Sequence, residues 1–405
     1  MKDNFYKYAK LLLVKGLCIE EGEPLLINAP IDAIDFVRVL TEVACELKID
    51  DIYYDWVDDE LKHTLLKNYN EESIKKSKFW DKTIHNEYVK KNAAFLFLID
   101  SNPDIMGDID SNKLRIASEY SLKTRNIYRE MQENNKVDWC IAGVATESWA
   151  KLLYNDTPNA KEKLWNKIFD ICLVNEKDPL LSWTNKMKAN KEMCSKLNNL
   201  NIKNLHYTNR LGTDLTIELP KNALWCGGSS LIKGREPIVN LPTEEVFTTP
   251  NKFKTKGRVY TSLPLIHNGI MIKNICLDFE DGKVVNYSSS TGLNELKNIL
   301  EFDSESMMLG EAALVDKNSP IAMSKTLFYE TLYDENAACH IALGRGFKEC
   351  LKDGHNKSNK ELEDLGYNKS KNHVDIMIGT EDLNIIATTY DNKEIVIFKN
   401  GSFNI

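Results

Sequence analysis

Carboxylate and imidazole side chains recur through the second half of the chain, each in or beside a short apolar run. They are Glu244, Glu245, Glu311, Glu335, His340, His373 and Asp375. Mixed carboxylate and imidazole ligands suit divalent metal ions. Two such ions held side by side can activate a water molecule and polarise a carbonyl group at once. The sequence therefore predicts a metal-dependent site built from this set.

The spacing of His373 and Asp375 is the clearest part of the pattern. They are two residues apart in an apolar run, and in a strand such residues project to the same face. They can therefore hold one ion while Val374 and Ile376 pack behind them. The alternative is a strand with a polar outer face and no metal.

Other members of the set leave alternatives open. His340 lies among small and apolar residues, where a histidine with satisfied hydrogen bonds in the core is the common case. Glu311 lies in a strand that looks buried, so it needs a metal or a salt bridge to a basic residue. Glu244 and Glu245 are adjacent, and in an extended segment they point to opposite faces, so one ion is not expected to bind both. The alternative for this pair is a helix N-cap that involves Thr243.

The first half of the chain alternates between helix and strand patterns. Helical periodicity covers residues 5–17 and 33–47 and begins again at 147, and short apolar runs typical of strands cover 24–29, 51–56, 93–99 and 139–144. This alternation predicts an α/β domain over residues 1–200 with a mostly parallel sheet covered by helices.

The pattern changes near residue 200. Short strands and turns follow, at 215–220, 257–263, 283–287 and 312–315, with one helix at 293–301. Asp281-Gly282 is a strong hairpin signal. We predict a β-rich domain over residues 201–405 that carries the metal site, with a polar surface excursion at 352–371.

Composition excludes several classes of function. The 405 residues are 42% hydrophobic and 28% charged, as in ordinary globular proteins, and the formal net charge of −8 argues against a nucleic-acid partner. No apolar run approaches the ~20 residues that span a bilayer, and the N-terminus lacks the apolar core of a signal peptide. We therefore expect no membrane partner and a cytoplasmic location.

The nine cysteines include no Cys-x-x-Cys pair. We expect buried, reduced thiols rather than disulfides or a thiolate metal site. Cys339 directly precedes His340, so contact with the site is the one exception to consider.

Four blocks in order give the chain a family resemblance. They are Asn240-Leu-Pro-Thr-Glu-Glu-Val-Phe-Thr-Thr-Pro250, Leu309-Gly-Glu-Ala-Ala-Leu-Val315, the run from Leu327 to Gly344, and Asn368-x-Ser-x-x-His-x-Asp-x-Met-Ile-Gly379. Together they resemble the thermophilic-type metalloaminopeptidases, the aminopeptidase T, aminopeptidase S and PepS group. The resemblance extends over essentially the whole length.

The resemblance implies a specific site and activity. Carried over position by position, the metal ligands are Glu245, Glu311, Glu335, His340, His373 and Asp375, with Glu311 as the bridging carboxylate. Family members remove N-terminal residues from short peptides, use two divalent ions (zinc or cobalt, with manganese a further candidate) and form homodimers with enclosed active sites. The expected mechanism is attack by a metal-activated water. Glu244 is the candidate general base, and its alternative role is to support Glu245.

One position departs from the family pattern. Phe347 stands where the family usually has a tyrosine, and Lys348 where it has a proline. A phenol can donate a hydrogen bond to the developing oxyanion and a phenyl ring cannot. Losing one such donor costs ~3–4 kcal/mol, roughly 10²–10³ in rate. Tyr329 and Tyr333 are candidates to replace it.

Two other functions compete with the peptidase. His340, His373 and Asp375 alone would suit a mononuclear iron, as in a ring-cleaving dioxygenase, although the added glutamates argue against it. A non-catalytic binding homologue is the second rival, supported by Phe347 and opposed by the complete ligand set.

Overall fold

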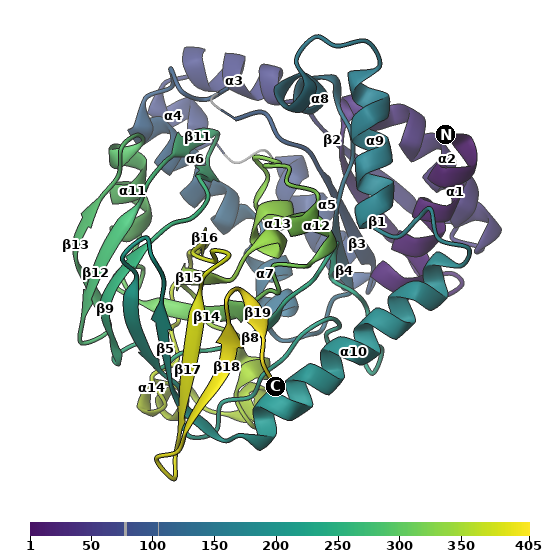
Figure 1. Ribbon diagram of the computed structural model, residues 1–405. Helices are drawn as coiled ribbons and strands as arrows, with labels where there is room; N and C mark the ends of the chain where they lie inside the picture. Colours follow the sequence, from purple (N-terminus) through teal and green to yellow (C-terminus); the bar gives the residue numbers. More distant parts are fainter. Residues whose placement is uncertain (77–78, 104) are drawn as a thin grey trace. The chain divides into compact units, whose positions relative to one another are not determined.

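The computed structural model describes residues 1–76, 79–103 and 105–405, which form two compact units (Figure 1). The first unit contains Met1–Lys186 and Ser229–Thr243, and the second contains Met187–Gly228 and Glu244–Ile405. Residues Ser229–Thr243 thus return to the first unit late in the chain. A domain boundary at residue 200 stays a prediction.

The first unit is built on a five-stranded sheet whose strands all run parallel, in the order β2-β1-β3-β4-β7. The strands are β1 (Leu25–Pro30), β2 (Ile52–Val57), β3 (Ala94–Ile99), β4 (Trp139–Gly143) and β7 (Asn240–Leu241). Its helices are α1 (Lys2–Leu11), α2 (Ile34–Glu46), α3 (Asp59–Asn68), α4 (Glu71–Ile74), α5 (Phe79–Lys90), α6 (Ser111–Thr124), α7 (Asn126–Glu133), α8 (Glu147–Tyr154) and α9 (Ala160–Ile171), and α10 (Pro179–Asn199) begins in it. The predicted parallel α/β arrangement is confirmed.

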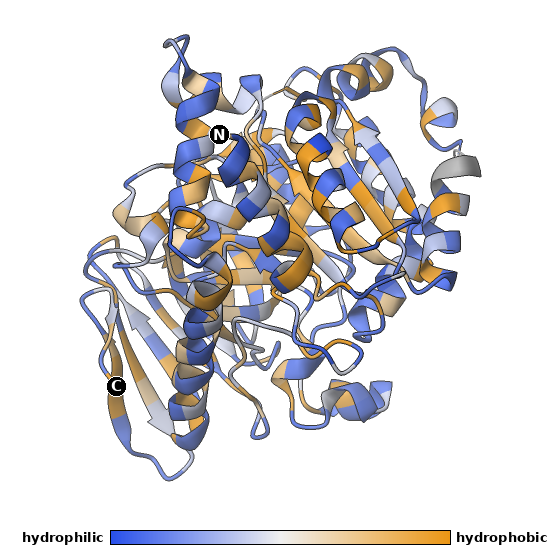
Figure 2. Cartoon of the chain, turned by 90° about the vertical axis from the view of Figure 1, so that its right-hand side faces the viewer, coloured by the Kyte–Doolittle hydropathy of each residue, from blue (hydrophilic) through white to orange (hydrophobic). Residues whose placement is uncertain are grey.

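The inner strands β1, β3 and β4 are mainly apolar because both of their faces are covered, whereas the edge strand β2 is partly exposed. On β3, Phe95 and Phe97 face a cluster that includes Tyr128 of α7, whose ring centroid lies 4.6 Å from that of Phe95. Leu96 and Leu98 alternate with them and are buried on the other face. In Figure 2 the inner strands of the sheet are largely orange, whereas the helices carry both colours.

The second unit is dominated by antiparallel sheets. An eight-stranded sheet has the order β13-β12-β9-β6-β5-β17-β18-β19, a four-stranded sheet the order β16-β15-β14-β8, and β10 and β11 form a separate pair. The strands are β5 (Ile202–Thr208), β6 (Asp214–Glu218), β8 (Val246–Thr248), β9 (Thr255–Tyr260), β10 (Leu265–His267), β11 (Ile270–Ile272), β12 (Cys276–Glu280), β13 (Lys283–Ser288), β14 (Leu309–Leu314), β15 (His340–Gly344), β16 (His373–Met377), β17 (Asn384–Thr389), β18 (Glu394–Lys399) and β19 (Ser402–Phe403). The helices are α11 (Leu293–Leu300), α12 (Pro320–Met323), α13 (Thr331–Asp334) and α14 (Asn359–Asp364). The predicted β-rich character and the hairpin at Asp281-Gly282 are confirmed.

The expected surface excursion at 352–371 is wrong in its last part. Tyr367, Asn368 and Ser370 are buried. The Asn368 amide donates to the carbonyl oxygens of Glu305 and Met308, each at 3.1 Å. A polar segment can be buried when its side chains satisfy backbone groups, and composition alone does not reveal this.

No helix among the described residues is long and apolar enough to cross a bilayer.

Candidate metal centre

The four-stranded sheet gathers most of the predicted ligands on one face. Strand register aligns Glu311 of β14 with Ala342 of β15, and Ala342 with Asp375 of β16. Residues paired in this way share a face, and so do residues two apart on each strand. His340 and His373 therefore lie on the same face. The small side chain of Ala342 leaves room between the two carboxylates.

The opposite face of this sheet belongs to the hydrophobic core. Val246, Ala312, Leu314, Ile341, Leu343, Val374 and Ile376 are all buried in one cluster. Val374 and Ile376 thus pack behind His373 and Asp375, as the alternation in sequence predicts. A register slip on any of these strands would place ligands in the core, so packing fixes the site.

The side chains on the site face approach one another closely. His340 Nε2 lies 2.9 Å from Glu245 Oε2, and His373 Nε2 lies 3.2 Å from Glu311 Oε2 and 3.3 Å from Asp375 Oδ1. Two groups of donor atoms, each within 4.8 Å of one another, could hold an ion: Glu245, Glu311 and His340, and Glu311, His373 and Asp375. Glu311 is common to both groups.

Glu335 and Glu244 lie outside these two groups. Glu335 is buried in a short 3-10 turn, Glu335–Ala337, just before β15. Burial, followed by the charges of Asp375 and Glu245, raises the pKa of Glu335 well above its usual value, so its carboxyl lies close to the same set. Glu244 is half-buried, and its backbone N–H donates to Asn336 Oδ1 at 2.6 Å.

Asn336 is a site residue that sequence reasoning missed. It is fully buried, and its Nδ2 donates to Leu332 O at 2.8 Å and lies 3.5 Å from Glu335 Oε1. One amide therefore holds the backbone beside Glu245 and lies against Glu335. The available signal was its position next to Glu335 in an apolar run, where a polar side chain needs a partner.

Both imidazoles are oriented by backbone carbonyls. His340 Nδ1 lies 3.1 Å from Ala338 O, and His373 Nδ1 lies 2.7 Å from Arg345 O. A carbonyl oxygen only accepts, so each Nδ1 carries the proton and donates. This leaves both Nε2 atoms toward the carboxylates. A histidine held in this way is typical of metal sites.

The site carries more acidic than basic side chains, and this excess shifts their pKa values. Burial raises the pKa of Glu311 to about 7. Burial lowers the pKa of His340 and of His373, but the adjacent carboxylates outweigh it and bring each to about 10. Asp375 Oδ1 is buried and accepts no well-aligned hydrogen bond among the described residues. Four carboxylates share this face with only two imidazoles, so the donor set fits divalent cations.

Phe347 lies directly beside the site. Its ring centroid is 5.1 Å from that of His373 and 5.1 Å from that of Phe247, both edge to face. The ring of Phe347 therefore lies at the edge of the candidate site and offers no hydroxyl. Tyr333 is fully buried against Phe328, and Tyr329 has a left-handed backbone with φ of 57°.

Cys339 does not belong to the ligand face. It is buried in the hydrophobic cluster, where its Sγ donates to Val315 O at 3.5 Å. Burial raises the pKa of this thiol to about 12, so it stays protonated. The expectation of a buried thiol is confirmed for Cys339 but is wrong for Cys45, which is exposed.

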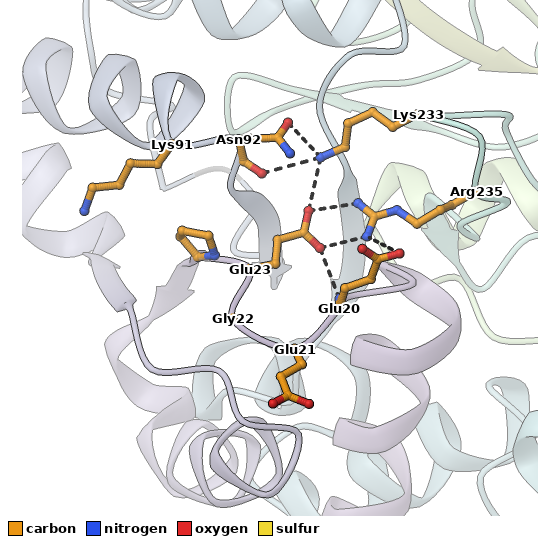
Figure 3. A pocket seen from close by; sticks show the side chains of 9 residues that line it. Glu20, Glu21, Gly22, Glu23, Lys91, Asn92, Lys233 and Arg235 are labelled. Atoms are coloured by element: carbon orange, nitrogen blue, oxygen red, sulfur yellow. Dashed lines mark hydrogen bonds and ion pairs between the residues drawn. The ribbon is translucent and has the colours of Figure 1, made fainter.

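A separate charged pocket of about 400 Å³ lies in the first unit (Figure 3). Lys233 and Arg235 point toward Glu23, and Arg235 makes two bonds of 2.8 Å to its carboxylate. Lys233 Nζ also lies 2.5 Å from the buried Asp138. Lys233 and Arg235 are thus already paired with acidic side chains. These ion pairs hold the returning segment Ser229–Thr243 against the rest of the first unit.

Comparison with known proteins gives one consistent result. A family model described as thermophilic metalloprotease (M29) matches residues 1–403. Aminopeptidase AmpS of Bacillus subtilis is 36% identical over 98% of this chain and 97% of that protein. Aminopeptidase 2 of Geobacillus stearothermophilus is 35% identical over 98% and 97%. The solved structure of wild-type AmpT from Thermus thermophilus superposes with a TM-score of 0.91 at 31% identity and covers 100% of both chains. The chain therefore belongs to the thermophilic metalloprotease (M29) family and is a peptidase.

Proposed function

We propose that this peptidase is an aminopeptidase that removes N-terminal residues from short peptides by means of two divalent metal ions. One observation carries the proposal: two groups of three donors meet on one sheet face and share Glu311. The aminopeptidases named among its relatives support the same activity. Membership of a metalloprotease family implies a divalent metal; the number of ions is part of the proposal.

The proposed ligands divide between two positions. Glu245 and His340 would hold one ion, His373 and Asp375 the other, and Glu311 would bridge them. Glu335 is the sixth ligand, assigned to the position beside Asp375 because, after burial, the Asp375 charge raises the pKa of Glu335 more than any other neighbouring charge does. When bound, such a pair of ions acidifies a water molecule and polarises the scissile carbonyl.

The protein's own groups have separate tasks. Glu244 is the proposed general base, since it is a half-buried carboxylate whose backbone is fixed by Asn336 beside the first ligand. His340 and His373 are kept in one tautomer by backbone carbonyls, so both present Nε2 without rearrangement. Phe347 closes one side of the site with an apolar ring and contributes no hydrogen bond to an oxyanion.

Neither alternative function is favoured. A mononuclear iron enzyme would use His340, His373 and Asp375 together, whereas the two histidines lie in different donor groups. A binding homologue would have no need of six metal ligands. Zinc or cobalt as the metal, a homodimer with an enclosed site, and a cytoplasmic location belong to the same proposal, on the family resemblance.

The test is hydrolysis of amino-acid anilides and dipeptides by metal-stripped protein, with zinc, cobalt, manganese or iron added back. Metal-dependent release of the N-terminal residue is expected, with two ions bound per chain in equilibrium dialysis. Glu311→Gln should abolish release and lower the metal content, whereas Glu301→Gln, at an exposed acid, should change neither. Release of the N-terminal residue without added metal, or full activity of Glu311→Gln, would show that the proposed metal centre is wrong.

A further inference from the structure

Two thiols from distant parts of the chain meet close to the candidate metal centre. Cys226 is half-buried, and its Sγ donates to Glu349 O at 3.4 Å, the carbonyl that precedes Cys350. Cys350 is fully buried, and its pKa is raised by burial and then by the neighbouring Cys226 thiol. The backbones are tied together as well, because Leu224 N donates to Cys350 O at 2.7 Å. The pair is thus held by main-chain contacts on both sides.

This thiol pair is connected to the site through aromatic rings. Cys226 and Phe247 exchange two backbone hydrogen bonds of 2.8 Å, and Cys350 Sγ lies 3.9 Å from Phe247 O. The Phe247 ring packs against Phe347, and the Phe347 ring packs against His373. A movement of the two cysteines therefore acts on the backbone of β8 and, through two ring contacts, on a proposed ligand.

We propose that Cys226 and Cys350 form a reversible disulfide under hydrogen peroxide and that this bond lowers the turnover of the peptidase. The partly exposed Cys226 sulfur attacks the peroxide, so that an S–O bond forms, the O–O bond breaks and one water leaves. The Cys350 sulfur then attacks Cys226, the S–S bond forms, the S–O bond breaks and a second water leaves. Both thiol protons end in water, and a dithiol reductant reverses the change.

The physical reason for an effect on turnover is the contraction that the bond requires. Bonded sulfur atoms lie about 2 Å apart, much closer than two hydrogen-bonded thiols. The shift passes to Phe247 because its backbone is paired with Cys226. A displacement of about 1 Å at a catalytic group costs up to about 10²-fold in rate, so we expect kcat to fall at least about 10-fold. Burial first, and then the Cys226 contact, raises the pKa of the Cys350 thiol, so the second step is slow.

The experiment exposes the zinc-loaded full chain to hydrogen peroxide, blocks remaining thiols with N-ethylmaleimide and maps tryptic peptides without reduction. Cleavage after Lys221, Lys233, Lys348 and Lys352 places the two cysteines in peptides 222–233 and 349–352. The expected result is one linked species of these peptides, lighter by two hydrogen atoms, that appears as kcat falls and disappears with dithiothreitol as kcat recovers.

Two variants test whether the disulfide forms between Cys226 and Cys350 and not at other cysteines. Cys226→Ser should give no linked species and keep its turnover in peroxide, whereas Cys276→Ser, at another half-buried thiol, should behave as the unaltered chain. A link from 222–233 to 192–196, which carries the nearby Cys194, or no link at all, would overturn the proposal. A link that leaves turnover unchanged overturns its effect on the site. The turnover measurement depends on the proposed function but the peptide map does not, so the two failures are distinguishable.

Discussion

Replacing Asn336 by alanine should weaken both the fold around the site and its hold on metal. The change leaves two backbone groups without their partner, the N–H of Glu244 and the carbonyl of Leu332. Each buried group that loses its hydrogen bond costs roughly 1–3 kcal/mol. Leu332 is buried, but Glu244 is half-buried and water can reach its N–H. We therefore expect the free energy of unfolding to fall by about 2–4 kcal/mol.

Asn336→Ala should also lower the affinity for metal, by more than the loss of fold stability alone would explain. Asn336 fixes the backbone next to Glu245 and lies against Glu335, and removing such a supporting partner typically lowers metal affinity about 10–100-fold. Urea unfolding of the metal-free chain measures the first effect, and competition with a chromophoric chelator measures the second. Asn318→Ala, at an exposed asparagine that bonds to Asp316, is the matched control and should change neither.

The two measurements can disagree, and the disagreement is informative. If Asn336→Ala lowers stability but leaves metal affinity unchanged, Asn336 supports the fold alone and its positioning role is refuted. If neither quantity changes, the hydrogen bonds assigned to this amide are wrong.

Three further predictions follow from individual contacts. Phe347→Tyr should raise kcat by about 10²–10³ if a missing hydroxyl limits turnover; an unchanged kcat on the same dipeptides would mean that another group supplies the hydrogen bond. Burial raises the pKa of the Asp100 carboxyl to about 6 in the folded chain, although this carboxyl accepts a hydrogen bond from Thr146. The folded chain therefore favours the protonated carboxyl, and this preference stabilises the fold fully below about pH 4. That stability, roughly 3 kcal/mol, is lost as pH rises through about 6. Urea midpoints should show this slope in the unaltered chain and a flatter one in Asp100→Asn, and equal slopes would contradict it. Gly227→Ala places a Cβ 2.7 Å from Glu245 O and should cost about 1–3 kcal/mol with weaker metal binding. Gly234→Ala, where a Cβ meets nothing within 4 Å but φ is +80°, controls for loss of a glycine, and an equal effect of both changes on metal binding would reject the contact.

The sequence predicted those parts of the structure that depend on local periodicity. Continuous apolar runs such as 93–99 indicated strands buried on both faces, and the parallel sheet of the first unit contains them. Alternation around His373 and Asp375 correctly placed Val374 and Ile376 in the core. Such patterns are readable because side-chain direction repeats every two residues in a strand whatever the rest of the chain does.

What the sequence by itself determined is therefore the type of element, the buried face of each strand and the family to which the chain belongs. Only the tertiary structure decided which residues meet. The row from Glu311 through Ala342 to Asp375 depends on register between strands far apart in the chain. So do the contact of Asn336 with Glu244 and the meeting of Cys226 with Cys350. Register is set by how the cores of the strands pack, and a shift of one residue would turn each ligand to the opposite face. No local pattern contains that information, because the packing partners are supplied by other parts of the chain.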